Sequence, residues 1–182
     1  MRTEIKIGGF GGQGVILSAH IIGKSAAIYA DKYATMIQAF GPEARGSSCS
    51  AQVIISDQPV AYPYVKNPDI LIVMSQEAYT KFLPELKEGG ILITESDLID
   101  TTDIKPGIKH YSIPSTRIAE ELGKKLTLNI VMVGFSTAIV KELDKDSVYK
   151  AVETSVPKGT ETLNINAFNR GYYYGMELLS KV

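Results

Sequence analysis

The sequence contains little of what metal-binding and many catalytic domains require. Among its 182 residues there is one cysteine, Cys49, and there are two histidines, His20 and His110. A single thiol cannot form an internal disulfide or a four-cysteine zinc or iron–sulfur site. The histidines stand far apart and lack ligand-like neighbours, so we expect packing or surface roles for them. We therefore predict no metal site in this chain, and no thiol nucleophile, because no histidine lies near Cys49 in the sequence.

Strong net charge and long apolar runs are also missing. The sequence has 19 Lys and Arg against 20 Asp and Glu, which does not favour a surface for nucleic acid or anionic lipid. The most apolar run, Ile130 to Val140, is shorter than the roughly 20 residues that a membrane-spanning helix needs. No secretory signal precedes the first predicted strand. We therefore expect a cytoplasmic protein with no nucleic-acid partner and no membrane span, folded as one domain over residues 1–182.

A glycine-rich turn follows the first strand signal. The segment from Ile5 to Val15 reads I-K-I-G-G-F-G-G-Q-G-V, and helical periodicity begins directly behind it. Three of the glycines have the G-x-G-x-x-G spacing of phosphate-binding turns, where backbone amides and the positive end of a helix favour an anion. The candidate phosphate-binding residues are Gly9, Gly11, Gly12, Gln13 and Gly14.

The residues alone leave the purpose of this turn open. A dinucleotide site should have an acid at the end of the second strand, where it meets the ribose hydroxyls. The second strand signal, residues 33–38, ends on Gln38 and is followed by Phe40, while Asp31 precedes it. The alternative is a turn whose glycines only allow the helix to pack closely against the strand.

A second candidate loop runs from Gln38 to Ser48. It contains Gly-Pro and small residues, and it carries Glu43, Arg45 and Gly46. Loops on a rigid scaffold often hold binding residues, and a guanidinium suits phosphate or carboxylate. A solvated charge pair is the alternative interpretation of Glu43 and Arg45.

The remaining patterns predict alternating strands and helices. Further strands are expected at residues 50–56, 69–74, 91–94 and 110–114, and helices at 15–31, 76–83, 116–123, 129–140 and from about 163. The βαβ unit over 69–94 calls for parallel pairing with a right-handed crossover. We predict an α/β fold, namely one three-layer Rossmann-like domain with a mostly parallel sheet and a helical C-terminal part.

Some local features carry predictions of their own. We expect Ser75 to cap helix 76–83, and Ser115 or Thr116 to cap the helix that runs towards Gly123. Helix 129–140 is apolar nearly all round and needs cover on every side. In the last helix a stripe of small residues would let another backbone come close. That stripe is Ala167, Gly171 and Gly175.

Four segments together resemble one family. They are G-G-F-G-G-Q-G-V at 8–15, F-G-P-E-A-R-G at 40–46, the strand at 50–56 and P-D-I-L-I at 68–72. They resemble the gamma subunit of 2-oxoacid:ferredoxin oxidoreductases, most closely the 2-oxoglutarate members, over at least the first hundred residues. One departure is Ser47, where these relatives are expected to have glycine.

The resemblance implies a division of labour within a heteromeric enzyme. Such an enzyme decarboxylates 2-oxoglutarate oxidatively with coenzyme A, giving succinyl-CoA and carbon dioxide, and passes electrons to ferredoxin or flavodoxin. Thiamine diphosphate, magnesium and iron–sulfur clusters would lie on companion alpha, beta and delta subunits. This chain would have no catalytic residue of its own and would help to form the coenzyme A site and the subunit interface, through the glycine turn and the loop of Glu43, Arg45 and Gly46.

Two alternatives stay open. The same family also acts on pyruvate or on branched-chain 2-oxoacids. A different class is a free-standing Rossmann-like nucleotide-binding or regulatory module. Co-purification separates the classes, because a family member should bring partner chains and a brown, cluster-containing complex, whereas a free module stays colourless and binds nucleotide alone.

We predict that the isolated chain has no oxidoreductase activity and binds no thiamine diphosphate, because it lacks the residues for either. We also expect it to self-associate, since large uncovered apolar surfaces rarely stay in water. Dye reduction with 2-oxoglutarate and light scattering measure the two properties. Dye reduction by the chain alone would contradict the first, and a strict monomer at high concentration would contradict the second.

Overall fold

A six-stranded mixed sheet forms the centre of the molecule. The computed structural model describes residues 1–41 and 48–181. The strands are β1 (Arg2–Phe10), β2 (Tyr33–Phe40), β3 (Ser48–Ser56), β4 (Ile70–Val73), β5 (Ile91–Glu95) and β6 (Lys109–Ile113). Their order is β2-β3-β1-β4-β5-β6, and only β3 runs against the rest, because it pairs antiparallel with both β1 and β2. The mostly parallel sheet predicted from the sequence is confirmed.

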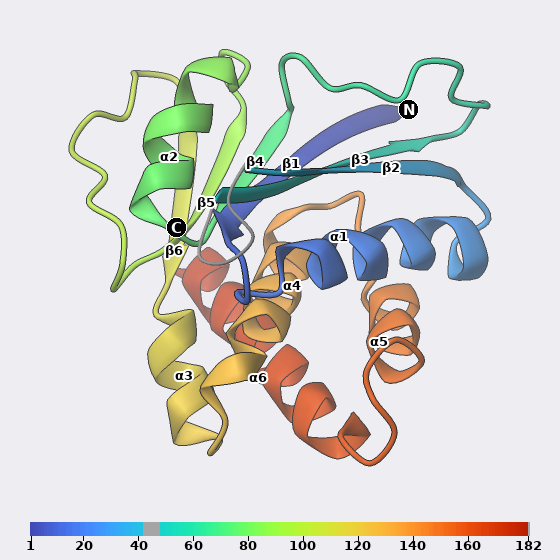
Figure 1. Cartoon of the computed structure of the whole chain (residues 1–182), viewed down its shortest axis with the longest axis vertical. Coiled ribbons are helices and arrows are strands. Elements are labelled where there is room, and N and C mark those ends of the chain that lie inside the picture. Colours follow the sequence, from blue (N-terminus) through green and yellow to red (C-terminus); the bar gives the residue numbers. More distant parts are fainter. Residues whose placement is uncertain (42–47, 182) are drawn as a thin grey trace.

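Helices cover both faces of this sheet (Figure 1). One face carries α2 (Gln76–Phe82). The other carries α1 (Val15–Lys24), α3 (Ser115–Glu121), α4 (Leu128–Ile139), α5 (Lys145–Glu153) and α6 (Glu161–Ser180). A π-helical turn, Ser25–Tyr29, continues α1, and short 3-10 turns follow α2 at Leu83–Glu85 and precede α4 at Lys125–Thr127. Three layers and a helical C-terminal part therefore agree with the predicted fold class.

The two layers of helix enclose two apolar cores. Alternate residues of the strands point to opposite faces, so Ile5 and Ile7 of β1 join the core below α1 and α4, whereas Leu71 and Val73 of β4 pack beneath α2. All four residues of β4 are buried, as expected for a strand covered on both sides. None of the helices in the described ranges has both the length and the hydropathy that a bilayer crossing requires.

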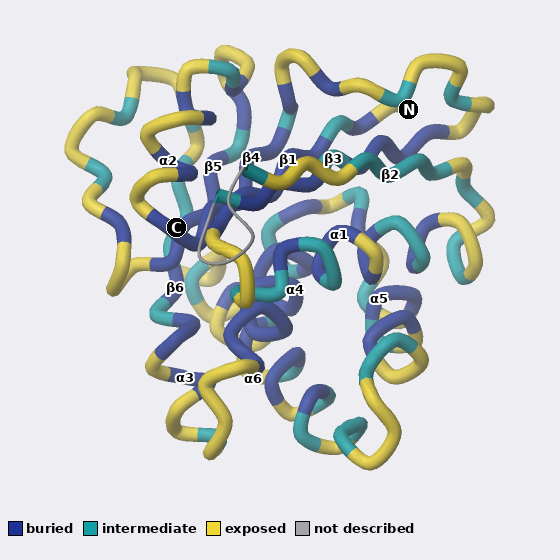
Figure 2. Tube along the Cα trace, viewed as in Figure 1, coloured by how far each residue is buried: buried dark blue, intermediate teal, exposed yellow. Residues whose placement is uncertain are grey.

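Helix α4 is buried over most of its length, as its sequence predicted (Figure 2). Its cover includes α6, which approaches so closely that two positions admit only glycine. A Cβ on Gly171 would lie 2.0 Å from the carbonyl oxygen of Val131, and a Cβ on Gly134 would lie 2.0 Å from that of Phe168. The predicted role of the small-residue stripe in α6 is thereby confirmed, and the approaching backbone belongs to α4.

The helix caps and one strand boundary agree only in part with the sequence predictions. Ser75 caps α2, accepting the amide of Ala78 at 3.2 Å. The prediction that Ser115 or Thr116 caps α3 is wrong. The helix starts directly after Pro114, and the Thr116 hydroxyl donates to Glu95 instead. The loop expected from residue 38 begins later, because β2 stays paired with β3 through Phe40.

The contact between α4 and α6 yields a stability prediction. Gly171→Ala should lower the free energy of unfolding by about 3 kcal/mol or more, because the new methyl group overlaps a backbone oxygen that cannot move freely. Gly23→Ala in α1 is the matched control. Its Cβ would meet only Val53 at 3.8 Å, so the better helix propensity of alanine should raise stability by about 0.5 to 1 kcal/mol. Urea denaturation of both variants measures these changes, and equal effects would contradict the assigned contact.

Candidate functional site

The predicted glycine turn joins the end of β1 to the start of α1. Gly12 and Gly14 have φ angles of 91° and 76°, in the left-handed region that favours glycine. A Cβ on Gly12 would meet nothing within 4 Å, whereas one on Gly14 would lie 2.4 Å from the side-chain nitrogen of Asn129. Gly12 is therefore required by backbone conformation alone, and Gly14 also by the approach of α4.

The side chain of Gln13 fills the inside of the turn. Its Oε1 accepts the amide of Phe10 at 2.7 Å, and its Nε2 donates to the carbonyl oxygen of Met74 at 2.8 Å. Because Met74 follows β4, these two bonds tie the turn to the neighbouring parallel strand. A Cβ on Gly9 would lie 2.6 Å from Gln13 Oε1, so Gly9 makes room for this amide. A ligand could therefore reach the turn only from its outer side.

The outer side of the turn exposes backbone donors. Gly11 and Gly12 are exposed, and α1 begins without a capping side chain among the described residues. The carbonyl oxygen of Gly14 is occupied, since it accepts the hydroxyl of Ser18 at 2.9 Å and the side-chain amide of Asn129 at 3.3 Å. The first amides of a helix have no intrahelical acceptor and mark its positive end. This geometry suits an anionic group, such as a phosphate, at the N-terminus of α1.

The second predicted loop begins and ends beside this turn. Glu43, Arg45 and Gly46 lie outside the described residues, and their roles stay predictions. The flanking strands are described, and they pair Phe10 of β1 with Ser48 and Phe40 of β2 with Cys49. The amide of Gly41 also donates to the carbonyl oxygen of Ser48 at 2.8 Å. β2 thus ends, and β3 begins, at the same end of the sheet as the carboxyl end of β1.

The cysteine and the histidines lie in unrelated places. Cys49 is buried at the start of β3, and burial raises the pKa of its thiol. His20 is exposed on α1. His110 Nε2 lies 2.8 Å from the Thr94 hydroxyl, and burial lowers the pKa of this imidazole, so its neutral form is favoured. Within residues 1–41 and 48–181, no group of three or more His, Cys, Asp or Glu side chains could hold a metal ion.

A buried acid that was not predicted from the sequence lies at the carboxyl end of β5. Glu95 is fully buried, and it accepts the amide of Asp97 at 3.2 Å and the hydroxyl of Thr116 at 3.3 Å. Burial raises the pKa of this carboxyl, and the negative charge of Asp97 adds to the effect. The predicted strand stopped at Thr94, one residue short. An acid that directly continues an apolar strand was the available signal.

The comparisons with known proteins agree on one family. The model of one protein family, described as Pyruvate ferredoxin/flavodoxin oxidoreductase, matches residues 4–174. The 2-oxoglutarate synthase subunit KorC of Methanocaldococcus jannaschii is 46% identical over 180 residues, which cover 98% of this chain and 96% of that relative. A similar crystal structure is that of the gamma subunit of a keto/oxoacid ferredoxin oxidoreductase from Geobacter sulfurreducens. It has a TM-score of 0.83 and 35% identity, with 96% of this chain and 99% of that chain covered.

A longer protein shares the fold. The 2-oxoglutarate:ferredoxin oxidoreductase from Magnetococcus marinus, solved with 2-oxoglutarate, coenzyme A and succinyl-CoA bound, has a TM-score of 0.88 at 20% identity. The match covers 97% of this chain but 31% of that chain. At this identity the likeness concerns the fold alone.

Burial of Glu95 predicts a pH-dependent stability. A carboxyl in the unfolded chain has a pKa of about 4.3, and that of Glu95 is raised in the folded protein. Below the unfolded-state pKa both states are protonated and there is no penalty. As the pH rises further, the unfolded state ionises first, so stability is lost until the folded-state pKa is passed. Glu95→Gln should therefore raise the melting temperature at pH 7 to 8, with no gain near pH 4.

The exposed Glu177 provides a control, because its pKa is shifted in the opposite direction to that of Glu95. Lys181 lowers the pKa of this carboxyl, so its contribution to stability is present above the unfolded-state pKa and is lost in acid. Glu177→Gln should leave stability unchanged or slightly lower at neutral pH. Differential scanning calorimetry from pH 4 to 8 measures both variants. A gain for Glu95→Gln that does not depend on pH would contradict the assignment.

Proposed function

The chain belongs to the pyruvate ferredoxin/flavodoxin oxidoreductase family, and on this premise we propose that it is the gamma subunit of a cytoplasmic 2-oxoglutarate:ferredoxin oxidoreductase. The resemblance inferred from the Gly-Gly-Gln-Gly and Gly-Pro-Glu-x-Arg-Gly segments is thereby confirmed. The chain is one subunit of a heteromeric oxidoreductase. The observation that carries the proposed substrate is the 46% identity to a 2-oxoglutarate synthase subunit across nearly the full length of both chains.

Within that enzyme, we assign this chain a part in binding coenzyme A. Coenzyme A carries phosphates, and the exposed Gly11 and Gly12, with the start of α1 that no described side chain caps, offer backbone donors to an anion. Gln13 supports this role indirectly, because it holds the turn against β4 and fixes the direction of those amides. Arg45 would add a guanidinium from the loop that starts and ends at the same edge of the sheet.

The companion subunits would supply the redox chemistry. We expect thiamine diphosphate, magnesium and iron–sulfur clusters on alpha, beta and delta subunits, because this chain has a single cysteine and that one is buried. Electrons would pass through those subunits to ferredoxin or flavodoxin. The residues of this chain would bind the phosphates of coenzyme A, orient it and complete the interface between subunits.

Purification of the native complex tests the proposal. The complex should be brown, should contain partner chains and should reduce ferredoxin with 2-oxoglutarate and coenzyme A. Pyruvate and 2-oxoisovalerate assayed in parallel test the alternative substrates of the same family. A higher kcat/KM for either would overturn the proposed substrate, and a colourless chain that binds nucleotide without partners would overturn the proposed function.

The glycine turn yields a prediction about coenzyme A. Gly12→Val should impair assembly or raise the KM for coenzyme A, because a side chain would stand where the ligand or a partner backbone comes close. Gly89→Val is the control. Gly89 also has positive φ, 73°, and a Cβ added there would meet nothing within 4 Å, but it precedes β5, at the amino ends of the parallel strands and thus opposite the glycine turn. Both variants should lose about 1 to 3 kcal/mol of stability through backbone strain.

After each variant is reconstituted with wild-type partners, the yield of the complex and the KM for coenzyme A are measured separately. Complex yield and the KM for coenzyme A should change for Gly12→Val and stay near wild type for Gly89→Val. Arg45→Ala should produce a defect related to that of Gly12→Val, because its guanidinium would act on the same ligand. Wild-type values for both Gly12→Val and Arg45→Ala would mean that the turn serves packing alone.

A further inference from the structure

The strand β2 lies at one edge of the sheet. Within the described residues it pairs only with β3, so alternate residues direct their backbone N–H and C=O groups away from the sheet. Natural edge strands usually carry charges, prolines or bulges that prevent pairing with another chain. The sequence of β2, Y-A-T-M-I-Q-A-F, contains no charge and no proline. Its backbone is therefore suited to pair with an extended strand.

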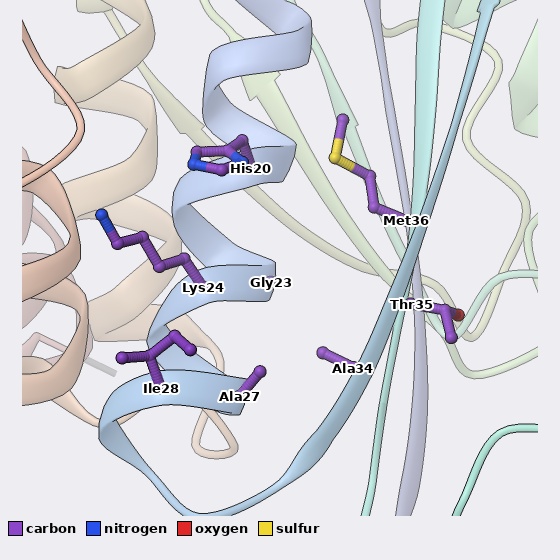
Figure 3. A pocket seen from close by; sticks show the side chains of 8 residues that line it. All are labelled: His20, Gly23, Lys24, Ala27, Ile28, Ala34, Thr35 and Met36. Atoms are coloured by element: carbon purple, nitrogen blue, oxygen red, sulfur yellow. The ribbon is translucent and has the colours of Figure 1, made fainter.

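A recess lies beside this edge, between β2 and α1 (Figure 3). Its volume is about 420 Å³. Gly23 and Ala27, on α1 and the turn that continues it, and Ala34 of β2 leave the space, because their side chains are too small to fill it. Ala34 and Met36 point towards α1, whereas Thr35 points away. The edge thus combines free backbone groups with an apolar hollow on the α1 face.

The same strand carries a side chain of the right kind to fill the hollow. By the alternation of strand residues, Phe40 lies on the same face as Ala34 and Met36. Phe40 is 65% exposed, although its side chain is large and apolar. One strand therefore presents both an aromatic projection and, six residues earlier, a place that can receive one.

Two-fold symmetry limits the registers in which two such strands could meet. In an antiparallel pair, two residues that face each other point to the same side of the sheet. In two identical strands, facing residues must therefore both have even or both have odd numbers, so the two-fold axis passes between two copies of one residue. An axis at Ile37 places Phe40 opposite Ala34 of the second copy, over the recess formed with Gly23 and Ala27. An axis at Met36 would place Phe40 opposite Lys32, beyond the end of β2 and its recess.

We propose that two copies of this chain associate through antiparallel β2 strands about an axis at Ile37, with Phe40 of each copy in the recess of the other. The pairing continues the sheet across the dimer and places α1 of both copies on the same face. No like charges meet between the paired strands, because β2 is uncharged along its whole length. A second copy fits better than an unrelated strand, because projection and recess lie on one strand and complement each other twice.

Disulfide trapping tests the register. In an antiparallel pair, facing Cα atoms lie about 4.5 to 5.5 Å apart, within the range that a disulfide spans. Ile37→Cys, in a Cys49→Ala background that removes the native thiol, should therefore give a covalent dimer on oxidation. Ala39→Cys is the control on the same face of β2. Its two thiols would be offset by four residues, about 14 Å along the strands, and should cross-link poorly.

A charge variant tests the association itself. Ile37→Lys places two lysines across the axis and should weaken the dimer at least about tenfold in sedimentation equilibrium. Circular dichroism should be unchanged, because Ile37 is only partly buried on an edge strand. Three results would each overturn the proposal: a monomeric wild-type chain at all concentrations, equal cross-linking of Ala39→Cys, or loss of companion subunits with Ile37→Lys while self-association persists. The first two outcomes leave the proposed coenzyme A role untouched, because they do not involve the glycine turn.

Discussion

The two hydrogen bonds of the Gln13 amide hold the candidate site together. They join the turn after β1 to the end of β4, and thereby fix the path of the chain into α1. The backbone could not pass so close to this side chain if residue 9 carried a Cβ. Asn129 then fixes the other end of the turn by donating to Gly14 from the first turn of α4. The orientation of the exposed amides at Gly11 and Gly12 follows from these contacts.

This arrangement changes the meaning of the glycine spacing. In a dinucleotide-binding turn one of the glycines lets the backbone approach the pyrophosphate. Here the space at Gly9 is taken by Gln13, and the space at Gly14 by Asn129. Within the turn, Gly12 combines a left-handed backbone with open surroundings. A glycine pattern in the sequence records where a Cβ is not tolerated, but it does not record whether a ligand or the protein itself occupies the space.

Patterns within a single element were predictable from the sequence, and contacts between distant elements were not. The all-round apolar character of α4 and the small residues of α6 predicted burial and close backbone approach, because periodicity is a local property. The partner of that approach could not be read from the sequence. The failed cap at α3 has the same origin, since Thr116 donates to Glu95, a residue 21 positions earlier in the chain.

The candidate site was predictable to a similar extent. The turn at Gly11 and Gly12 and its place before α1 follow directly from the sequence. The convergence of β1, β2 and β3 at one edge depends on β3 running against the other strands, and no local pattern encodes that reversal. The extension of β2 to Phe40 likewise depends on its pairing with Cys49. Pairing between strands therefore determines two features: the candidate site at the carboxyl ends of β1 and β2, and the position of β2 at the edge of the sheet.

The burial of α4 has a consequence for how the chain is made. This helix is buried from Leu128 to Thr137, and part of its cover is α6, which is synthesised afterwards. About 50 residues separate the start of α4 from the end of α6, which corresponds to roughly 3 to 10 s of translation. During this interval the nascent chain exposes its most apolar helix without the cover that α6 provides. Docking of α6 then covers this helix and shields its apolar surface from chaperones and from other nascent chains.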